Sequence, residues 1–592
     1  NITSQIRMFK VSNLTLFLSS PDIKKRFFIL QFLFLVSSIF EVGGISLIGP
    51  LIYFTSEAAE ASQNQYFIYM FEFLNLQSYE SFLLLYSIFT VLIIVLGGAA
   101  SFLSVTYLSK IATSSGINLS AQVLEKYLDM QWKEHLLIDK SKMINEIYQE
   151  TVRVTQNIFL PILMINKSLF LSLILVSFLL IISWQAAISL FFILSAIYLI
   201  LFLVLKRSLN ANSKILTDAH ENRYKFLNDT FESMKQIHIW RNEKIFQDGF
   251  EIASNAWGNA LRRNMNISLV PRYIVETLIL VCVTIGVGIF FYNPGENFSQ
   301  NIPSISIFIF SAFKLLPAIQ QIYAFISTIT GNIYSLNNLA ELLSDKEQSA
   351  SIDSEIDYFS PLQTLEFKNL SFHYPDSGFK LRDINLSFSK GEIIAITGYS
   401  GSGKSTFIDL LMGLTMPDSG KILFNGEEFS IYESNSWFKK VSYLPPKIHL
   451  INESIEQNIH FSDAAEINSR KIERILNEVN LNGFQDDHKA ANNINFSSGQ
   501  IQRLGIARSV YKDHEIICYD EPTSALDNQN RDNFIARMQR DKHEVLTMLI
   551  SHDLSLLQAA DKVLVFDDGK IDFFGSYDDA LQESDIMATL RA

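Results

Sequence analysis

Long apolar stretches separated by polar connections dominate the first part of the chain. Six of them follow a mixed N-terminal segment, near residues 27–55, 81–109, 159–183, 186–206, 268–292 and 304–330. Each meets or exceeds the ~20 residues that an α-helix needs to cross the hydrocarbon core of a bilayer. Between the third and fourth stretches lies the tripeptide Ser183-Trp184-Gln185, which predicts a tight turn. The pattern predicts a helical membrane domain with six spans.

Basic residues are distributed unevenly among the connections. The connections at 56–80 and 293–303 contain no Lys or Arg, whereas those at 110–158 and 207–267 contain many. Because cytoplasmic connections of membrane proteins are enriched in basic residues, both termini and both long connections are expected in the cytoplasm. Buried helices of a large soluble protein would explain neither the length of the stretches nor this asymmetry. The long connections are amphipathic, which predicts helices that extend the spans into the cytosol.

The pattern changes to short β runs, turns and helices from Leu365 onward. A polar, acidic stretch at 341–363 precedes this change and is typical of a linker. We therefore expect a transmembrane domain at 1–340, a linker at 341–363 and a second domain at 364–592, whose motifs are described below. The expected fold class is an α-helical transmembrane domain plus an α/β domain with a phosphate-binding loop.

Composition agrees with this division. The chain is 48% hydrophobic with a mean hydropathy of +0.18, although 18% of its residues are charged, because the apolar residues concentrate in the first part. A net charge of −13 argues against nucleic acid as a general partner. The two cysteines, Cys282 and Cys518, lie far apart, which predicts neither a disulfide framework nor a thiolate zinc site.

The segment from Gly398 to Thr406 fits the phosphate-binding pattern G-x-x-x-x-G-K-[ST] between an expected strand and an expected helix. Glycines allow backbone N–H groups to surround a phosphate, and the helix N-terminus adds partial positive charge. Lys404 would contact the β- and γ-phosphates, and Ser405 would offer a hydroxyl to Mg²⁺. The candidate residues of the loop are Gly398, Ser400, Gly401, Ser402, Gly403, Lys404, Ser405 and Thr406. The alternative is a glycine-rich turn without a ligand.

Further candidate residues follow the loop in a fixed order. A buried strand ends in Asp520 and Glu521, which are suited to hold Mg²⁺ through water and to accept a proton from the attacking water, respectively. A second strand ends before His552, which is placed to contact a γ-phosphate. Ser497 and Gly499 begin a helix-like run and would offer donors to a phosphate.

With all these motifs in this order, the chain resembles the ATP-binding-cassette (ABC) transporters over essentially its whole length, as an exporter half-transporter. The resemblance implies ATP and Mg²⁺ as cofactors, and a catalytic pair of Glu521 and His552. It implies adenine stacking on Tyr374, and metal binding by Ser405 and, through water, Asp520. The remaining nucleotide contacts that it implies are Ser497, Gly499, Gln500 and Asp527. Two ATP molecules would lie between two cassettes, which implies a homodimer, or else a heterodimer, in a bacterial inner membrane.

Three departures from the family pattern stand out. Pro446 occupies the position where the family has a glutamine, and proline offers no side-chain ligand for Mg²⁺ or water. Ser498 replaces a glycine of the signature and adds a Cβ at a tight approach. The stretch 491–495 lacks the Glu- and Gly-rich element that usually precedes the signature. Since Glu521 and His552 are present, we expect slow but real hydrolysis.

Charged residues within the apolar stretches are costly and therefore informative. Four of them are candidates for a substrate cavity, namely Glu41, Arg272, Glu276 and Lys314. Arg272 and Glu276 are spaced i,i+4, so they either neutralise each other or form a cavity wall that meets an anionic headgroup. Lys314 has no partner nearby in the sequence, which favours the cavity. The aromatic stretch 66–76 is either a short interfacial helix or a loop packed on the helix ends.

The membrane part is most similar to the lipid-linked oligosaccharide flippases of the PglK type, in the stretches 40–50, 270–276 and 305–317. This similarity implies a basic cavity for a pyrophosphate linker, matched by Arg272 and Lys314, whereas Gln321 stands where a second arginine is expected. It favours an ATP-driven flippase that moves a lipid-linked oligosaccharide or related glycolipid from the inner to the outer leaflet. The alternatives are an exporter of a peptide or other amphipathic substrate, and an ATP-gated channel or regulator.

Overall fold

The computed structural model divides the chain into two compact units. Residues 1–130 and 137–347 form a helical unit, and residues 131–136 and 348–592 form an α/β unit. The residues that the structure describes are 21–56, 71, 78–292, 298–344, 360–374, 380–432, 434–461, 467–481 and 496–591. Apart from residue 71, the aromatic stretch 66–76 lies outside these ranges, as does the stretch 491–495.

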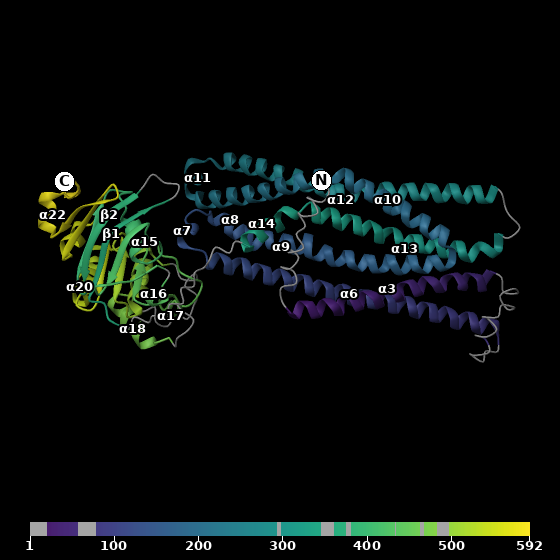
Figure 1. Ribbon diagram of the computed structural model, residues 1–592, viewed down its shortest axis with the longest axis horizontal. Helices are drawn as coiled ribbons and strands as arrows, with labels where there is room; N and C mark the ends of the chain where they lie inside the picture. The colour runs from purple at the N-terminus through teal and green to yellow at the C-terminus, as the bar shows by residue number, and fades with distance from the viewer. Residues whose placement is uncertain are drawn as a thin grey trace. The chain divides into compact units, whose positions relative to one another are not determined.

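Long helices that pack along one another build the helical unit (Figure 1). They are α3 (Pro21–Ser56), α6 (Tyr79–Leu128), α10 (Leu160–Glu232), α12 (Glu243–Tyr292) and α13 (Phe298–Thr330). The shorter elements are α8 (Lys140–Asn145), η1 (Glu146–Glu150), α9 (Thr151–Val154), η2 (Thr155–Phe159), α11 (Met234–Trp240) and α14 (Ile333–Ser344). In the described part, the segments Lys25–Ile52, Tyr79–Leu128, Lys140–Ile182 and Ile309–Thr330 are long and apolar enough to cross a membrane. They coincide with four of the six stretches expected from the sequence.

Helix α10 contains both the third and the fourth apolar stretch. The structure assigns helix throughout residues 183–185, where the sequence predicts a turn. Even so, Arg153 donates to the Thr217 hydroxyl at 3.0 Å, 64 positions further along the chain. Because a straight helix rises 1.5 Å per residue, these positions would lie roughly 95 Å apart if the segment were straight. The chain therefore reverses direction within α10, and its two arms lie side by side.

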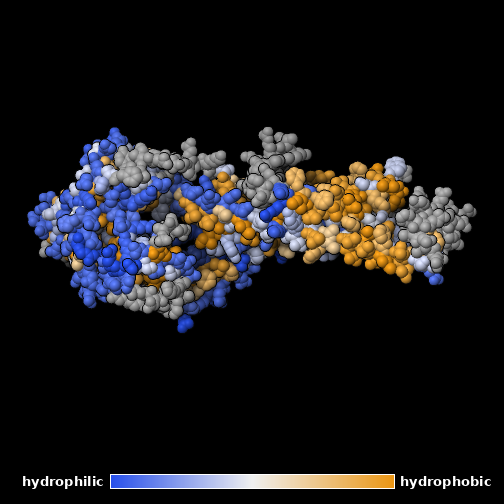
Figure 2. Space-filling model, turned by 90° about the horizontal axis from the view of Figure 1, so that it is seen from below, coloured by the Kyte–Doolittle hydropathy of each residue, from blue (hydrophilic) through white to orange (hydrophobic). Residues whose placement is uncertain are grey.

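The surface of the spans is apolar. Large hydrophobic side chains face outward, including Phe28, Phe102, Ile181, Val204 and Phe313. Figure 2 shows hydrophobic residues gathered over the spans and hydrophilic residues over the α/β unit. A continuous apolar exterior on helices of this length matches lipid as the surrounding solvent.

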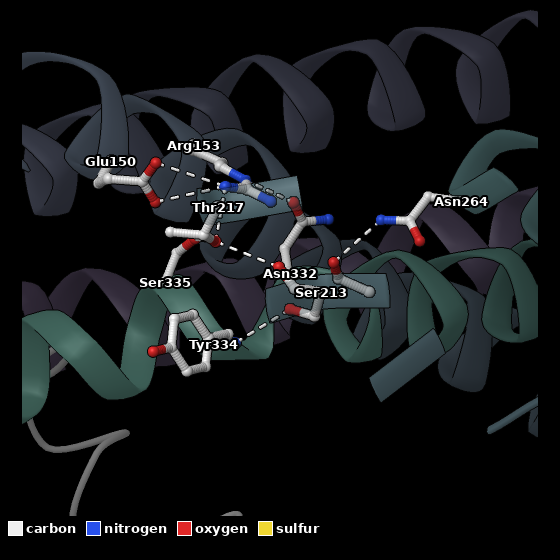
Figure 3. A network of polar contacts seen from close by, with 9 residues as sticks. Glu150, Arg153, Ser213, Thr217, Asn264, Asn332, Tyr334 and Ser335 are labelled. Carbon is white, nitrogen blue, oxygen red and sulfur yellow. Dashed lines mark hydrogen bonds and ion pairs between the residues drawn. The ribbon is translucent and has the colours of Figure 1, made fainter. Parts of the chain in front are cut away.

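A buried polar network joins the helices beyond the apolar spans (Figure 3). Arg153 is 8% exposed and lies 3.4 Å from Glu150. Its Nε donates to the Asn332 side chain at 2.8 Å, and its Nη1 donates to Thr217 at 3.0 Å. Asn264 of α12 donates to the Gly331 carbonyl at 3.0 Å, at the junction between α13 and α14. These bonds connect α9, α10, α12 and the α13–α14 junction.

Two sheets form the framework of the α/β unit (Figure 1). The first has the order β2 (Lys380–Ser389), β1 (Thr364–His373), β4 (Ser419–Phe424) and β5 (Glu427–Glu428), and its strand pairs are antiparallel. The second has the order β10 (Lys570–Gly575), β9 (Lys562–Asp567), β3 (Ile393–Gly398), β8 (Leu546–Ile550), β7 (Ile516–Asp520) and β6 (Val441–Leu444). Its pairs are parallel, except that β10 and β9 are antiparallel.

The helices of the α/β unit are α15 (Lys404–Leu411), α16 (Asn435–Phe438), α17 (Ile455–His460), α18 (Ser469–Glu478), α19 (Ser498–Tyr511), α20 (Asn528–Asp541), α21 (Leu554–Ala559), α22 (Tyr577–Glu583) and α23 (Asp585–Arg591). All residues of β3 are buried, as expected for a central parallel strand. Phe407 of α15 packs against Phe367, Phe388 and Phe566 and thereby ties the helix to both sheets. This packing fixes the start of α15, where the phosphate loop ends.

Candidate functional site

The phosphate loop joins β3 to α15 and depends on glycines at two points. Gly398 has φ +139°, and a Cβ there would lie 2.2 Å from the Phe566 carbonyl oxygen. Gly403 has φ +112° and is the N-cap residue of α15. Because side chains disfavour both conformations, glycine is required here to aim the loop's N–H groups inward. Lys404 donates to the carbonyls of Gly398 and Tyr399 at 2.7 and 2.8 Å and holds the loop closed.

A cavity of about 510 Å³ opens beside this loop. Its lining residues are Tyr374, Ser400, Gly401, Gly403, Lys404, Ser405, Thr406, Asp520, Glu521, Ile550 and His552. Most of the residues that the sequence predicts for the nucleotide site are thus brought together in one place, from four separate stretches of the chain. Gly398 and Ser402 belong to the same loop but do not line the cavity, and both are buried.

The carboxylates lie at the carboxyl end of β7, next to β8. The Glu521 N–H donates to the Ile550 carbonyl at 3.0 Å, and Glu521 has φ +49°. A non-glycine residue in this left-handed region is strained, and such strain clusters at functional sites. His552 Nε2 lies 3.9 Å from Glu521 Oε1. The pair therefore faces the cavity from two adjacent strand ends.

Burial controls the electrostatics of the cavity. Burial raises the pKa of Asp520 and the pKa of Glu521. The negative charge of the neighbouring Asp520 raises the pKa of Glu521 further. Burial lowers the pKa of Lys404, and burial together with the Lys404 charge lowers the pKa of His552. The imidazole is therefore neutral at pH 7. A raised carboxyl pKa suits Glu521 as a proton acceptor, because a general base works best when its pKa approaches the operating pH.

The donor set of the cavity fits a magnesium–nucleotide complex. The Ser405 hydroxyl and the Asp520 carboxylate line the same cavity as the phosphate loop. Mg²⁺ prefers such oxygen ligands and takes only one or two of them from a protein, the rest coming from phosphates and water. In keeping with this, the described residues hold no cluster of three or more His, Cys, Asp or Glu suited to a metal. Ser405 and Asp520 would therefore hold the ion.

Four further predicted nucleotide contacts do not line this cavity. Ser497 and Gln500 form a reciprocal cap at the start of α19, with bonds of 3.3 and 2.8 Å. Asp527 caps α20, where it accepts from the Asn530 N–H at 2.8 Å. At Gly499 a Cβ would lie 2.8 Å from the Ala525 carbonyl oxygen. Within one chain these residues build the start of α19 and of α20.

Sequence reasoning missed two polar contacts near the cavity. The Tyr443 hydroxyl of β6 donates to Asp520 Oδ2 at 3.1 Å. Trp132 of α7 (Trp132–His135), a segment that groups with the α/β unit, donates to Asp409 Oδ2 at 3.4 Å. A tyrosine on the strand next to β7 was the available signal for the first contact. The second joins positions 277 apart, which no local pattern connects.

The four charged candidates in the spans form two ion pairs. Arg272 Nε lies 2.9 Å from Glu276 Oε1, in agreement with mutual neutralisation on one helix face. Lys314 has no partner nearby in the sequence, but its Nζ lies 3.0 Å from Glu41 Oε2. The partner comes from α3, 273 positions away. Gln321 is exposed and accepts from the Ser168 hydroxyl at 3.1 Å.

Lys167 is a third basic residue in this region and was missed, although a charge inside an apolar stretch was a visible signal. Its Nζ donates to the Ser101 hydroxyl at 2.6 Å. The charges of Glu41 and Lys314 both act on it. Glu41 pairs with only one of the two lysines, so the cluster of Glu41, Lys167 and Lys314 contains two basic side chains and one acidic side chain.

Comparison with known proteins adds independent findings. The family model described as "ABC transporter transmembrane region" matches residues 46–313, and the model described as "ABC transporter" matches residues 381–524. Two proteins named ATP-dependent lipid A-core flippase are each 25% identical to this chain. The match to the protein from Pseudomonas syringae pv. tomato covers 85% of this chain and 84% of that protein. The match to the protein from Pseudomonas aeruginosa covers 84% of this chain and 82% of that protein.

One solved structure, described as a bacterial Atm1-family ABC exporter with ATP bound, is similar with a TM-score of 0.75. It is 18% identical, and the match covers 96% of this chain and 98% of that chain. At this identity the likeness concerns the fold, which agrees with a helical transmembrane region followed by an α/β nucleotide-binding domain. The chain belongs to the ABC transporters, and its ATPase is coupled to transport.

Proposed function

We propose that this chain is an ATP-driven flippase that moves an anionic glycolipid, such as a lipid-linked oligosaccharide, from the inner to the outer leaflet. It would work in a bacterial inner membrane with six spans in a domain at 1–340 and with both termini in the cytoplasm. The cassette at 364–592 would bind ATP and Mg²⁺. The relatives named as lipid A-core flippases support a lipid substrate at this general level.

The observation that carries the proposal is the charge cluster of Glu41, Lys167 and Lys314. Lys167 lies among apolar helices with one neutral hydrogen-bond partner, Ser101. A cation in such surroundings is stabilised when an anion approaches it, and intramembrane charges mark substrate pathways. A phosphate or pyrophosphate headgroup supplies this anion. Arg272 and Glu276 neutralise each other and contribute polar contacts without net charge.

The proposed active form is a dimer, most simply a homodimer. Ser497, Gly499 and Asp527 lie at helix starts that do not line the chain's own cavity. A second cassette would bring these residues to the γ-phosphate, where the N-terminus of α19 supplies partial positive charge. With a different partner chain the same contacts would form in a heterodimer, so cross-linking of the purified single chain distinguishes the two arrangements.

Removing the Lys167 charge tests the substrate class. We expect Lys167→Gln to raise the lipid concentration for half-maximal ATPase stimulation about tenfold, since a hydrogen bond to a charged group contributes ~1.5–3 kcal/mol. Lys167→Arg should retain most of the response. The measurement is ATPase activity in nanodiscs, titrated with a polyprenyl pyrophosphate-linked oligosaccharide, with phosphorylated lipid A and with its dephosphorylated form.

Lys110→Gln is the matched control, because Lys110 is an exposed lysine of the same helical unit. The dephosphorylated lipid should stimulate wild-type and Lys167→Gln protein equally. Stimulation by peptides rather than by either lipid would favour the peptide exporter. ATP binding without any stimulated hydrolysis would favour an ATP-gated channel or regulator. Equal lipid responses of wild-type and Lys167→Gln protein would contradict the role of the cluster.

Pro446 predicts slow basal hydrolysis that a single substitution should relieve. Pro446 is exposed and has no polar side-chain atom to hold Mg²⁺ or the attacking water. Pro446→Gln should therefore raise the basal ATPase rate several-fold, whereas Pro446→Ala, which removes the ring without adding an amide, should not. Steady-state phosphate release by the three proteins is the measurement. Equal rates for the glutamine and alanine variants would remove the metal-ligand explanation.

A further inference from the structure

The Tyr443 hydroxyl is placed on the carboxylate that would hold magnesium. Strands β6 and β7 are parallel neighbours, with Tyr443 opposite Cys518. Side chains alternate along a strand, so Cys518 and Asp520 share one face of β7, and Tyr443 lies diagonally across from Asp520 on that face. The hydroxyl donates to Asp520 Oδ2 at 3.1 Å.

This bond has a directional consequence for Asp520. A carboxylate has two oxygens, and the Tyr443 hydroxyl occupies one lone pair of Oδ2. The rotation of the carboxylate is then restricted, while Asp520 lines the cavity together with Ser405 and the phosphate loop. Partners of this kind orient metal ligands and are needed for full metal affinity. Lys404 uses two of its three N–H donors on the loop carbonyls of Gly398 and Tyr399, which holds its ammonium at the loop.

Residue 446 gives the contact its importance. Pro446 lies two residues after Leu444, the last residue of β6. As a proline it has no side-chain donor or acceptor that could contact Mg²⁺ or its water ligands. A tyrosine present only for packing would bury its ring, whereas Tyr443 is 43% exposed and directs its hydroxyl at the carboxylate. We propose that Tyr443 is a positioning residue for magnesium, which orients Asp520 in a chain whose residue 446 cannot contribute.

The inference rests on the proposed use of ATP and Mg²⁺ by this chain, and its test separates the two. Equilibrium binding of ATP is measured with full-length Glu521→Gln protein in nanodiscs at increasing Mg²⁺, with and without Tyr443→Phe. Tyr443→Phe should raise the half-saturating Mg²⁺ concentration about tenfold, since loss of an outer partner typically lowers metal affinity 10–100-fold. ATP binding without Mg²⁺ should stay the same.

Two comparisons keep the test specific. Tyr577→Phe, on α22, removes a hydroxyl from a residue that does not line the cavity and should leave the Mg²⁺ curve unchanged. In a Pro446→Gln background the effect of Tyr443→Phe should shrink, because the amide then shares the task, and such non-additivity indicates coupling. Thermal melting of each variant in the absence of nucleotide checks that folding is intact.

The outcomes are distinct. If Mg²⁺ supports ATP binding identically with and without the Tyr443 hydroxyl, the positioning role is overturned and the proposed function stands. If no variant binds ATP at any Mg²⁺ concentration, the proposed function is contradicted together with this inference. A shifted Mg²⁺ curve in Tyr443→Phe, with normal melting and normal Mg²⁺-free binding, supports the role.

Discussion

Glu521→Gln should lower the rate of ATP hydrolysis about 10²–10⁴-fold, the usual contribution of a positioned general base. Glu521 lines the cavity beside the phosphate loop, and burial raises the pKa of its carboxyl toward the working pH. Glutamine keeps the shape and can still hydrogen-bond water, but it cannot accept the proton. ATP binding should persist, because Lys404 and the loop are untouched. Phosphate release and nucleotide binding, measured on the same preparation, separate the two effects.

Glu544→Gln provides the matched control, since Glu544 is an exposed glutamate of the same domain that does not line the nucleotide cavity. Its hydrolysis rate should equal that of the unmodified protein. Glu521→Gln protein with near-normal hydrolysis would show that another group activates the water. His552 would then be the first residue to examine, because its Nε2 lies 3.9 Å from Glu521 Oε1.

Arg153→Ala should destabilise the helical unit by about 3 to 5 kcal/mol, the typical loss when one partner of a buried ion pair is removed. The substitution leaves Glu150, which is 4% exposed, as a buried charge without its arginine. It also removes the donors to Asn332 and Thr217, so the α13–α14 junction loses its bond to α9. The expected result is a melting temperature lowered by several degrees in detergent.

Lys225→Ala is the control within the same unit. Lys225 pairs with Asp139 at 3.1 Å, but the two side chains are 56% and 43% exposed. Exposed pairs contribute only about 0–1 kcal/mol, so the melting temperature should change little. Equal melting temperatures for Arg153→Ala and Lys225→Ala would mean that the network in Figure 3 does not stabilise the helix junctions.

The nucleotide cavity was largely predictable because its chemistry depends on short, local patterns. Glycines at 398 and 403, a lysine at the helix start and carboxylates at a strand end each follow from backbone geometry and phosphate charge. The structure brings Lys404, Asp520 and Glu521 into one cavity. The same reasoning missed that Ser497 and Gln500 cap their own helix, although their S-x-x-Q spacing is the pattern of a capping box.

Contacts between distant segments could not be predicted from the sequence. Lys314 finds Glu41 across 273 positions, and Arg153 finds Thr217 across 64. Hydropathy predicts that such helices exist and how long they are, but not which faces meet, because lipid-exposed and buried positions are both apolar. The reversal within α10 was anticipated from two span-length apolar stretches joined by residues 183–185, but the predicted turn there is helix in the structure. Lys167 could have been noticed as a charged residue inside an apolar stretch, but its hydrogen-bond partner Ser101 could not be predicted.

Translocation itself tests the central claim most directly. Proteoliposomes that contain the purified chain and a fluorescent, phosphorylated glycolipid are supplied with ATP and Mg²⁺ outside, and lipid that becomes inaccessible to an external quencher is counted. The account predicts inward loss of accessible lipid that depends on ATP, stops with Glu521→Gln and weakens with Lys167→Gln. Lipid movement that continues unchanged in the Glu521→Gln protein, or no ATP-dependent movement of any phosphorylated glycolipid, would contradict it.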